Sequence, residues 1–386
     1  MTLLEKDKVI ILFYKSLTNI GGAENLLIKE YEFFQNEGLY PIIFTFENKI
    51  LDKSFKVIKI KNIFDLILKI KKIKPYKIIC SSGHIDIFIA SILGFFSYFL
   101  HIHQPSLLSF NETDKFALNN LEKLKKNFQK NEQIMMNIKI FKKLKKRLNI
   151  ISKIFINIRF LVSYLSISKA KKVFVLSSFS VQEKQALYNK PSISIRGAIQ
   201  KVNKLETNYK KDDNKNINLV IVSRIDINKR ISKVIRAIKK SNKKINLDIY
   251  GVGEYSSHLE RLIKLLNLDD RIKLKGFLEE RNKTEIINQY DYFVCVDMAD
   301  FRISCFEALN SKTPVILTKE SFPNEDFDNL NCFNYTDVDI KSLINTFNNL
   351  KYKNNLMIDW SSVEIKLKKL IWQNYFQKLN EHITKD

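Results

Sequence analysis

The sequence predicts an α/β protein with two parallel-sheet domains, and three observations support this prediction. Residues 290–318 (YDYFVCVDMADFRISCFEALNSKTPVILT) follow the order apolar strand, polar loop, helix opening near Ser304 and second strand, which is the building block of parallel sheets. Two further apolar strands, 218–223 and 245–250, end in turns that carry cations and glycines. The chain has 386 residues, 45% of them hydrophobic, which is enough for two domains that each have a core.

The hydrophobic pattern predicts strands and helices in alternation along the chain. Strands are expected over residues 9–13, 40–46, 76–80, 98–103, 172–177, 218–223, 245–250, 292–296 and 315–317. Helices are expected after a glycine turn at residues 19–24 and over residues 64–73, 178–187, 231–238, 343–350 and 360–379. Residues 205–216 are predicted to be a polar linker and residues 324–337 a loop. The longest apolar run, 85–100, contains Asp86 and suits a buried helix better than a membrane span.

The loop from Asp300 to Ser304 is the first candidate for a ligand site. In parallel sheets, ligands lie outside the carboxyl ends of the strands, where loop amides and a helix N-terminus favour anions. A phosphate-bearing ligand is therefore expected at this loop. Glu307 lies one turn into the helix and can accept hydrogen bonds from a sugar diol. The alternative is that Glu307 closes a capping box with Ser304.

Two other strand ends add to this site. Arg224 and Lys229 are five residues apart at a strand-to-helix turn, where they can converge on a diphosphate. Gly251 and Gly253 end the next strand, and their missing side chains allow the backbone to approach a ligand. Near the N-terminus, Gly22 opens a helix at a glycine turn, which either contacts a ligand or only makes the turn.

Five blocks carry a resemblance to a known family. The segments SRIDINKR, LDIYGVGE, LDDRIKLKGF, FRISCFEALNSKTPVI and GGAENLLIKEYEFF resemble, in order and spacing, glycosyltransferase family 4. The resemblance leaves out roughly residues 108–165. It implies the GT-B fold, in which two Rossmann-like parallel-sheet domains face a central cleft. The expected limits are 1–198 for an acceptor-binding domain, 199–365 for a nucleotide-sugar-binding domain, and 366–386 for a C-terminal helix that returns to the first domain.

The resemblance also implies roles for individual residues. Arg224 and Lys229 would stabilise the departing diphosphate, Glu307 would hold the ribose, and His103 would contact the donor sugar near the reacting carbon. His101 lies on the same face of the strand as His103, so the alternative is that one of the two histidines packs in the core and does not contact the sugar. The donor-binding residues are expected to be Gly22, Gly251, Gly253, Asp300, Phe301, Arg302, Ile303, Ser304 and Glu307. We expect no metal and no cofactor, and a UDP- or GDP-linked sugar as a substrate.

The chain departs from the family pattern in the paired-glutamate motif. Ala299 stands where the family has the first glutamate, which helps to position the donor sugar, and Asp300-Phe301-Arg302 replaces Gly-Phe-Gly. Asp297 and Asp300 are candidates to replace the missing carboxylate. Arg302 adds a cation beside the expected phosphate. Arg230 follows the phosphate-binding lysine in place of a glycine, which is a milder change.

The net charge of +24 predicts an anionic partner, and much of it is local. Residues 121–172 hold fifteen Lys and Arg against two Glu, a net +13, within a basic helical insertion at about 112–168. Apolar residues between 138 and 151 recur at spacings of three and four, so a helix here can lie on an anionic membrane surface. The alternative is a core-facing helix with a solvated basic back. Nucleic acid is not expected, because the interleaving residues are aliphatic rather than aromatic.

The predicted function is transfer of a sugar from a nucleotide-diphosphate donor to an acceptor hydroxyl. The resemblance implies retention of anomeric configuration and a lipid-linked or oligosaccharide acceptor, in the synthesis of bacterial surface polysaccharide, lipopolysaccharide or glycolipid. The alternative, which Ala299 supports, is a catalytically impaired scaffold that partners an active glycosyltransferase. An epimerase or hydrolase on the same fold would need further acid and base side chains. Four cysteines without metal or disulfide spacing, and the absence of a signal peptide, predict a cytoplasmic protein. The basic segment and the resemblance place it peripherally on the inner face of the cytoplasmic membrane.

Overall fold

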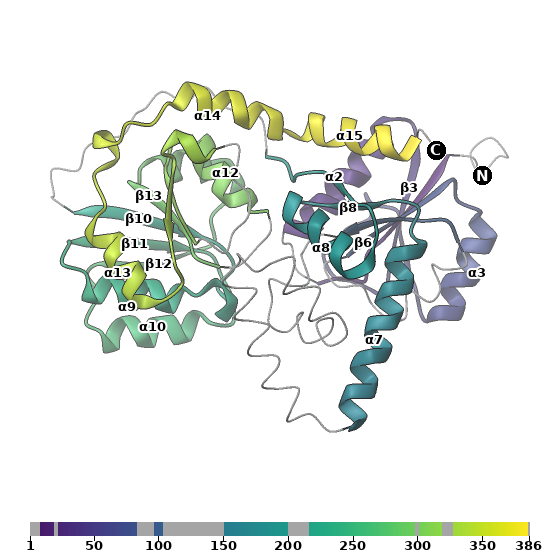
Figure 1. Ribbon diagram of the computed structural model, residues 1–386, viewed down its shortest axis with the longest axis horizontal. Coiled ribbons are helices and arrows are strands. Elements are labelled where there is room, and N and C mark those ends of the chain that lie inside the picture. The colour runs from purple at the N-terminus through teal and green to yellow at the C-terminus, as the bar shows by residue number, and fades with distance from the viewer. Residues whose placement is uncertain are drawn as a thin grey trace. The chain divides into compact units, whose positions relative to one another are not determined.

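The computed structural model describes residues 8–18, 22–82, 96–102, 150–199, 216–297, 301–318 and 327–384. Contacts divide the chain into two compact units (Figure 1). Unit 1 comprises Met1–Arg196 with Tyr375–Asp386, and unit 2 comprises Gly197–Asn374. Residues 85–95 of the expected apolar helix, residues 205–215 of the linker and most of the basic insertion lie outside the described residues, whereas residues 99 and 100 belong to a strand.

Unit 1 is built on a parallel sheet of seven strands in the order β5-β3-β1-β6-β7-β8-β9. The strands are β1 (Val9–Phe13), β3 (Tyr40–Thr45), β5 (Val57–Lys59), β6 (Lys77–Ser82), β7 (Phe99–Ile102), β8 (Val173–Val175) and β9 (Ile193–Ser194). A two-stranded parallel ladder joins β2 (Ser16–Leu17) to β4 (Glu47–Asn48). All five residues of β1 are buried, as expected for a central strand covered on both faces.

Helices complete unit 1. They are α2 (Gly22–Asn36), α3 (Ile63–Ile73), α7 (Ile150–Lys169), α8 (Ser178–Tyr188) and α15 (Trp372–Thr384), the last of which begins in unit 2. The helix that was predicted after the glycine turn is confirmed, and the apolar stripe that predicts it is buried at Leu26, Leu27, Tyr31 and Phe34. At the C-terminal end of the chain, Phe376 of α15 stacks on Phe33 of α2 with ring centroids 4.5 Å apart.

Unit 2 is built on a second parallel sheet, of six strands in the order β12-β11-β10-β13-β14-β15. Its strands are β10 (Ile217–Val222), β11 (Ile245–Tyr250), β12 (Ile272–Gly276), β13 (Tyr292–Cys295), β14 (Val315–Thr318) and β15 (Phe333–Thr336). Its helices are α9 (Ile231–Lys240), α10 (Ser256–Leu265), α11 (Glu280–Asn288), α12 (Ile303–Asn310), α13 (Ile340–Asn348) and α14 (Trp360–Leu367).

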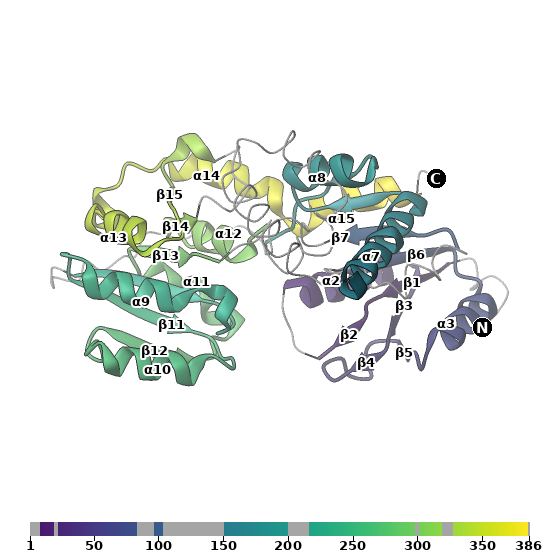
Figure 2. The same cartoon turned by 60° about the horizontal axis from the view of Figure 1, so that its bottom comes forward.

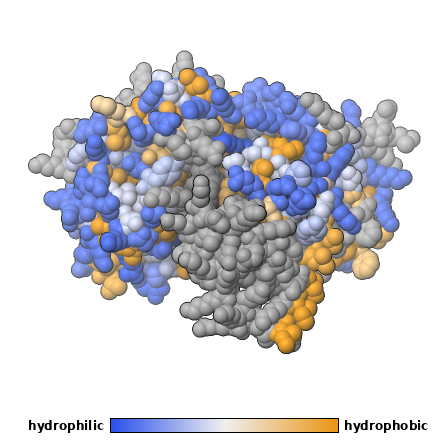
Figure 3. All heavy atoms as spheres, viewed as in Figure 1, coloured by the Kyte–Doolittle hydropathy of each residue, from blue (hydrophilic) through white to orange (hydrophobic). Residues whose placement is uncertain are grey.

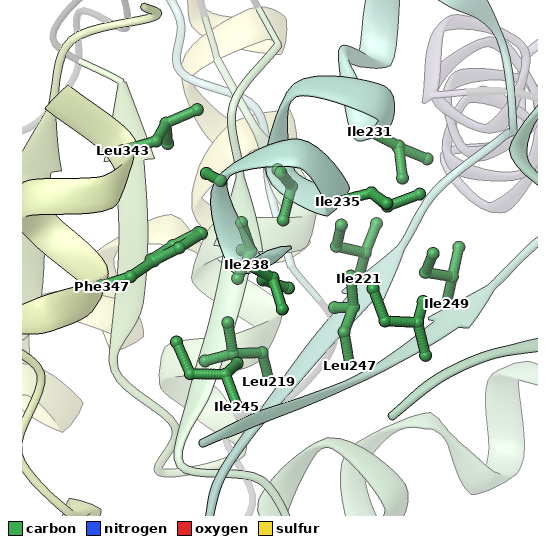
Figure 4. Close-up of a cluster of buried hydrophobic side chains, with 14 of the residues drawn as sticks. Leu219, Ile221, Ile231, Ile235, Ile238, Ile245, Leu247, Ile249, Leu343 and Phe347 are labelled. Atoms are coloured by element: carbon green, nitrogen blue, oxygen red, sulfur yellow. The ribbon is translucent and has the colours of Figure 1, made fainter. Parts of the chain in front are cut away.

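The core of unit 2 lies on both faces of this sheet because successive side chains of a strand point to opposite sides. Leu219 and Ile221 of β10 pack on one face against Ile235 and Ile238 of α9 and against Phe347 of α13 (Figure 4). On the other face lie residues of β10, β13, α12 and α14, among them Val220, Phe293, Phe306 and Leu367. Figure 2 shows the same elements from another side. The strand ends that carry the candidate site are therefore fixed by packing from above and below.

Two predictions about unit 2 were wrong. The expected loop over 324–337 contains the edge strand β15, which pairs with β14 in parallel. Three of its four residues, Phe333, Asn334 and Tyr335, are half-buried or exposed, so the sequence has no clear alternation of apolar and polar residues here. The expected single helix over 360–379 is two helices, α14 and α15, separated by a short 3-10 turn at Lys368–Leu370 and extended backbone at Ile371. The backbone at Ile371 bridges in parallel to Ile199.

Candidate functional site

The order of the strands in unit 2 creates one place where ligands are expected. From β10 the chain moves outward to β11 and β12, then returns to place β13 on the other side of β10. Neighbouring strands whose connections leave in opposite directions define a topological switch point, and in parallel sheets ligands bind at the carboxyl ends of such strands. Lys229 follows β10, in the 3-10 turn Ile227–Lys229, and Asp297 follows β13.

Lys229 and Asp297 form an ion pair across this switch point. The Lys229 Nζ lies 2.6 Å from Asp297 Oδ2, and Arg302 Nη1 donates to Asp297 Oδ1 on the other side. Burial raises the pKa of the Asp297 carboxyl, but Arg302 and Lys229 outweigh it and hold that pKa well below its ordinary value. Burial lowers the pKa of Lys229, and Asp297 more than offsets this effect, so the pKa of Lys229 is raised. All three side chains are therefore charged at neutral pH.

The cluster of Lys229, Asp297 and Arg302 carries one more positive charge than negative charge. The Arg302 side chain is 4% exposed and that of Asp297 10%. Within the part of the chain that the structure describes, Nε and Nη2 of Arg302 have no hydrogen-bond partner. Buried charges are stable when they are paired and hydrogen-bonded. The surplus charge and the two unpaired guanidinium nitrogens therefore favour an anionic ligand.

The N-terminus of α12 lies at the same place. Arg302 is the N-cap residue of this helix, and its side chain makes no capping hydrogen bond. The amides of the first helical turn have no acceptors within the helix and carry the positive end of the helix dipole, so they also favour an anion. The alternative role for Glu307, a capping box with Ser304, is wrong, because the N-cap is Arg302 and the Glu307 carboxylate has a different partner.

That partner is Lys283, which sequence analysis did not identify. The Nζ of Lys283, in α11, lies 2.5 Å from Glu307 Oε2, in α12. Burial raises the pKa of Glu307, and Lys283 opposes this effect without cancelling it. Lys283 and Glu307 are on separate helices 24 residues apart, and no sequence spacing links them. A ribose at Glu307 would have to share the carboxylate with Lys283.

Arg224 and Lys229 have separate partners in the structure. The Nε of Arg224 lies 3.0 Å from Asp226 Oδ2, and the Arg224 side chain is 65% exposed. Asp226 also caps the 3-10 turn that carries Lys229, by accepting a hydrogen bond from Asn228 N. The structure thus places Lys229, Asp297 and Arg302 together and leaves Arg224 with Asp226. Convergence of Arg224 and Lys229 on a diphosphate stays a prediction.

Gly251 and Gly253 are required by packing against the turn after β10. A Cβ on Gly251 would lie 1.8 Å from Ser223 O, and one on Gly253 would lie 2.1 Å from Ile225 O. Gly251 also has a φ of +139°, which other residues rarely adopt. These glycines therefore bring two loops together beside Lys229, and direct contact with a ligand stays a prediction.

Phe301 supports the loop that precedes α12. Its ring stacks on Phe306 with centroids 4.8 Å apart, and a Cβ on Gly197 would lie 2.6 Å from it. Ile303 and Ser304 are half-buried at the start of α12, and Gly22 is exposed at the start of α2. His103, Ala299 and Asp300 lie outside the described residues, so their predicted roles remain predictions.

His101 belongs to a buried network in unit 1. Its Nδ1 lies 3.1 Å from Glu30 Oε1, and the Tyr375 hydroxyl donates to the same carboxylate oxygen at 3.0 Å. His101 is the residue of the His101 and His103 pair that packs, as one alternative allowed. Glu30 lies among the apolar residues of α2, and a charged residue on an apolar face is the sequence signal that would have found this network.

The fold of this chain matches solved structures over almost its whole length. The lipopolysaccharide outer core galactosyltransferase WaaB, in its apo form, has a TM-score of 0.68 at 14% identity, covering 98% of this chain and 99% of that chain. The Anabaena protein HepE in complex with UDP-glucose has a TM-score of 0.69 at 16% identity, covering 98% and 100%. WaaG, a glycosyltransferase involved in lipopolysaccharide biosynthesis, has a TM-score of 0.70 at 11% identity, covering 98% and 100%. The chain therefore has the GT-B fold, which confirms the predicted fold class.

Sequence comparisons match parts of the chain. Residues 202–359, within unit 2, match the family model described as Glycosyl transferases group 1. The UDP-N-acetylglucosamine–peptide N-acetylglucosaminyltransferase GtfA subunit of Streptococcus pneumoniae serotype 4 (strain ATCC BAA-334 / TIGR4) is 28% identical over 117 residues. This match covers 29% of the chain and spans less than a quarter, 23%, of that relative.

Proposed function

We propose that the protein is a glycosyltransferase that moves a sugar from a nucleotide-diphosphate donor to an acceptor hydroxyl. The observation that carries this proposal is the cluster of Lys229, Asp297 and Arg302 at the switch point of unit 2, with its surplus positive charge beside the N-terminus of α12. The match of residues 202–359 to Glycosyl transferases group 1 covers the same segment. HepE, which has a similar fold, is in complex with UDP-glucose.

The chemistry follows from what the transfer requires. The bond between the sugar C1 and the phosphate oxygen breaks, a bond between C1 and the acceptor oxygen forms, and the leaving phosphate takes the acceptor proton. Charge accumulates on the departing diphosphate, and fixed positive charge at that place lowers the barrier. Lys229 and the first-turn amides of α12 would supply it, with Arg302 holding Asp297 and Lys229 in place. Arg224 would join them on rotating away from Asp226.

The other parts of the proposal rest on the resemblance. Glu307 would hold the ribose hydroxyls, and His103, in unit 1, would contact the donor sugar near C1. We propose retention of configuration, as the resemblance implies. We also propose transfer without a divalent metal, because Lys229 and the first-turn amides of α12 would supply the positive charge. The donor would be UDP- or GDP-linked. WaaB and WaaG act in lipopolysaccharide synthesis, which supports a lipid-linked or oligosaccharide acceptor and a place on the inner face of the cytoplasmic membrane.

Release of nucleoside diphosphate tests the reaction. Purified protein would be incubated with a panel of UDP- and GDP-sugars, with and without a lipid-linked acceptor. We expect release from one donor, increased by the acceptor. Lys229→Ala should lower kcat by about 10² to 10³, the usual effect of removing one group that stabilises a developing anion. Lys240→Ala, an exposed lysine at the end of α9, is the matched control and should leave kcat unchanged.

Two outcomes would contradict the proposal. Release with full activity in Lys229→Ala would show that the phosphate site is elsewhere. No release from any donor would favour the alternative, a GT-B scaffold that partners an active glycosyltransferase, which the replacement of a family glutamate by Ala299 supports.

A further inference from the structure

Helix α7 of unit 1 exposes a row of large aliphatic side chains. Ile150, Ile154, Ile158, Leu161 and Leu165 are 74%, 52%, 48%, 55% and 44% exposed. Their spacings of four, four, three and four residues place them on one face of the helix, in a stripe about 22 Å long. Figure 3 shows this apolar band along α7. We call these five side chains the α7 stripe.

The position of α7 in unit 1 accounts for the exposure. Near its C-terminal end, Ser166 and Ile167 are buried, and the Ser166 carbonyl accepts a hydrogen bond from Tyr98 OH. The N-terminal turns project away from the unit 1 sheet (Figures 1 and 2). A surface helix normally turns its apolar face toward the core. A continuous exposed apolar face instead marks an interaction surface.

The charge of the chain indicates which partner fits. Helix α7 contains no Asp or Glu, and residues 121–172, which include it, carry a net charge of +13. Helix α7 itself contains Lys153, Arg159 and Lys169, so the α7 helix of a second copy would carry the same excess of positive charge and would be repelled. An anionic bilayer can bind both the aliphatic stripe and the positive charge. Aliphatic side chains enter the boundary of the acyl chains, and lysines contact the headgroups. No helix in the described ranges is long and apolar enough to cross a bilayer.

We propose that the α7 stripe inserts into the surface of an anionic lipid bilayer and so orients the protein on the membrane. This inference rests on the membrane location in the proposed function, but it does not depend on the transfer chemistry. It also moves the apolar contact from residues 138–151, the segment that sequence analysis favoured, to residues 150–165.

Vesicle sedimentation of the full-length protein tests the stripe. The variant is Ile154→Ser, Ile158→Ser and Leu161→Ser combined. The matched control combines Leu265→Ser, Met357→Ser and Ile365→Ser, at apolar side chains of unit 2 that are more exposed than the three substituted in the stripe variant. Vesicles would be phosphatidylcholine alone or mixed with phosphatidylglycerol. We expect the wild type and the control to bind the mixed vesicles, and the stripe variant to bind at least about tenfold more weakly.

A second measurement reports insertion directly. Ile158→Cys, labelled with an environment-sensitive fluorophore, should shift its emission to the blue on mixed vesicles, whereas Leu265→Cys should not. The four native cysteines are buried and thus poorly reactive. Because the substituted side chains are exposed, the thermal midpoint of every variant should match the wild type.

Several results would overturn the proposal. The stripe variant could bind mixed vesicles as tightly as the wild type does. The wild type could bind neutral and mixed vesicles equally, or the fluorophore at residue 158 could show no emission shift. A dimer that the stripe variant converts to a monomer, with vesicle binding unchanged, would assign the stripe to a protein interface instead. Nucleotide release by the wild type without vesicles tests the transfer reaction separately, so failure of either proposal can be recognised.

Discussion

The two units bury polar side chains in different ways. In unit 1, Glu30, His101 and Tyr375 are 0%, 0% and 3% exposed and lie within hydrogen-bonding distance of one another. They come from α2, β7 and α15, so they tie the end of the chain to the first sheet. In unit 2, Lys229 and Arg302 flank Asp297 in loops at the strand ends, and the Lys229 side chain is 30% exposed.

Net charge and exposure distinguish the structural network of unit 1 from the candidate site of unit 2. The unit 1 network joins the Glu30 carboxyl group to an imidazole and a phenol, and all three side chains are buried. The unit 2 cluster has a surplus cation, an opening at Lys229 and a helix N-terminus beside it. Partial burial of the surplus positive charge costs desolvation free energy. A bound anion would offset this cost, so the surplus charge favours a ligand site.

The largest effect should come from removing the carboxylate of unit 2. Asp297→Asn leaves Arg302 and Lys229 without their counter-charge, and we expect it to lower the free energy of unfolding by about 3 kcal/mol. Denaturant titration would measure this loss. The depressed pKa of Asp297 means that the stabilisation is present above the unfolded pKa of about 4 and is lost as the pH falls.

Asp226→Asn is the matched control for this prediction. It makes the same substitution nearby, keeps a capping side chain on the 3-10 turn and loses only a pair with the exposed Arg224. It should cost less than about 1 kcal/mol. Equal losses in the two variants would show that the cluster has no special energetic role.

A smaller effect is expected from the unit 1 network. Tyr375→Phe removes the hydroxyl that donates to Glu30 and should lower the free energy of unfolding by about 2 kcal/mol, because a buried acceptor loses one of its donors. Tyr76→Phe, at a tyrosine that is 46% exposed, controls for the substitution itself. Nucleotide release at saturating donor should persist in Tyr375→Phe, whereas a loss as large as that of Lys229→Ala would break the distinction between the units.

The smallest effect concerns another buried cation of unit 2. Lys353 Nζ donates to Asn288 O at 2.8 Å, and burial lowers the pKa of Lys353 to about 8. Between this pKa and the unfolded value of about 10.4, the unfolded state binds the extra proton, so stability rises with pH. Between pH 8 and 9 we expect a gain of about 1 kcal/mol relative to Lys353→Met. Parallel pH profiles of the two proteins would contradict this prediction.

Much of the fold could be predicted from the sequence because local patterns report burial. Strand Ile245–Tyr250 alternates buried and half-buried residues, and Val9–Phe13 is apolar throughout, so both were predicted with their observed bounds. Arg302 was recognised as an added cation because it departs from a family motif. The edge strand Phe333–Thr336 was missed, since it is partly solvated and its pattern is irregular.

The residue pattern was enough to predict the alternation of strands and helices, the GT-B resemblance, the basic segment and the candidate residues at the strand ends. Which charged side chains lie next to one another became clear from the folded structure alone. Lys283 with Glu307, Asp297 between Lys229 and Arg302, and Tyr375 with Glu30 join residues that are distant in sequence. Periodicity records how each element faces the core, whereas contacts between side chains of different elements depend on how the sheets and helices pack.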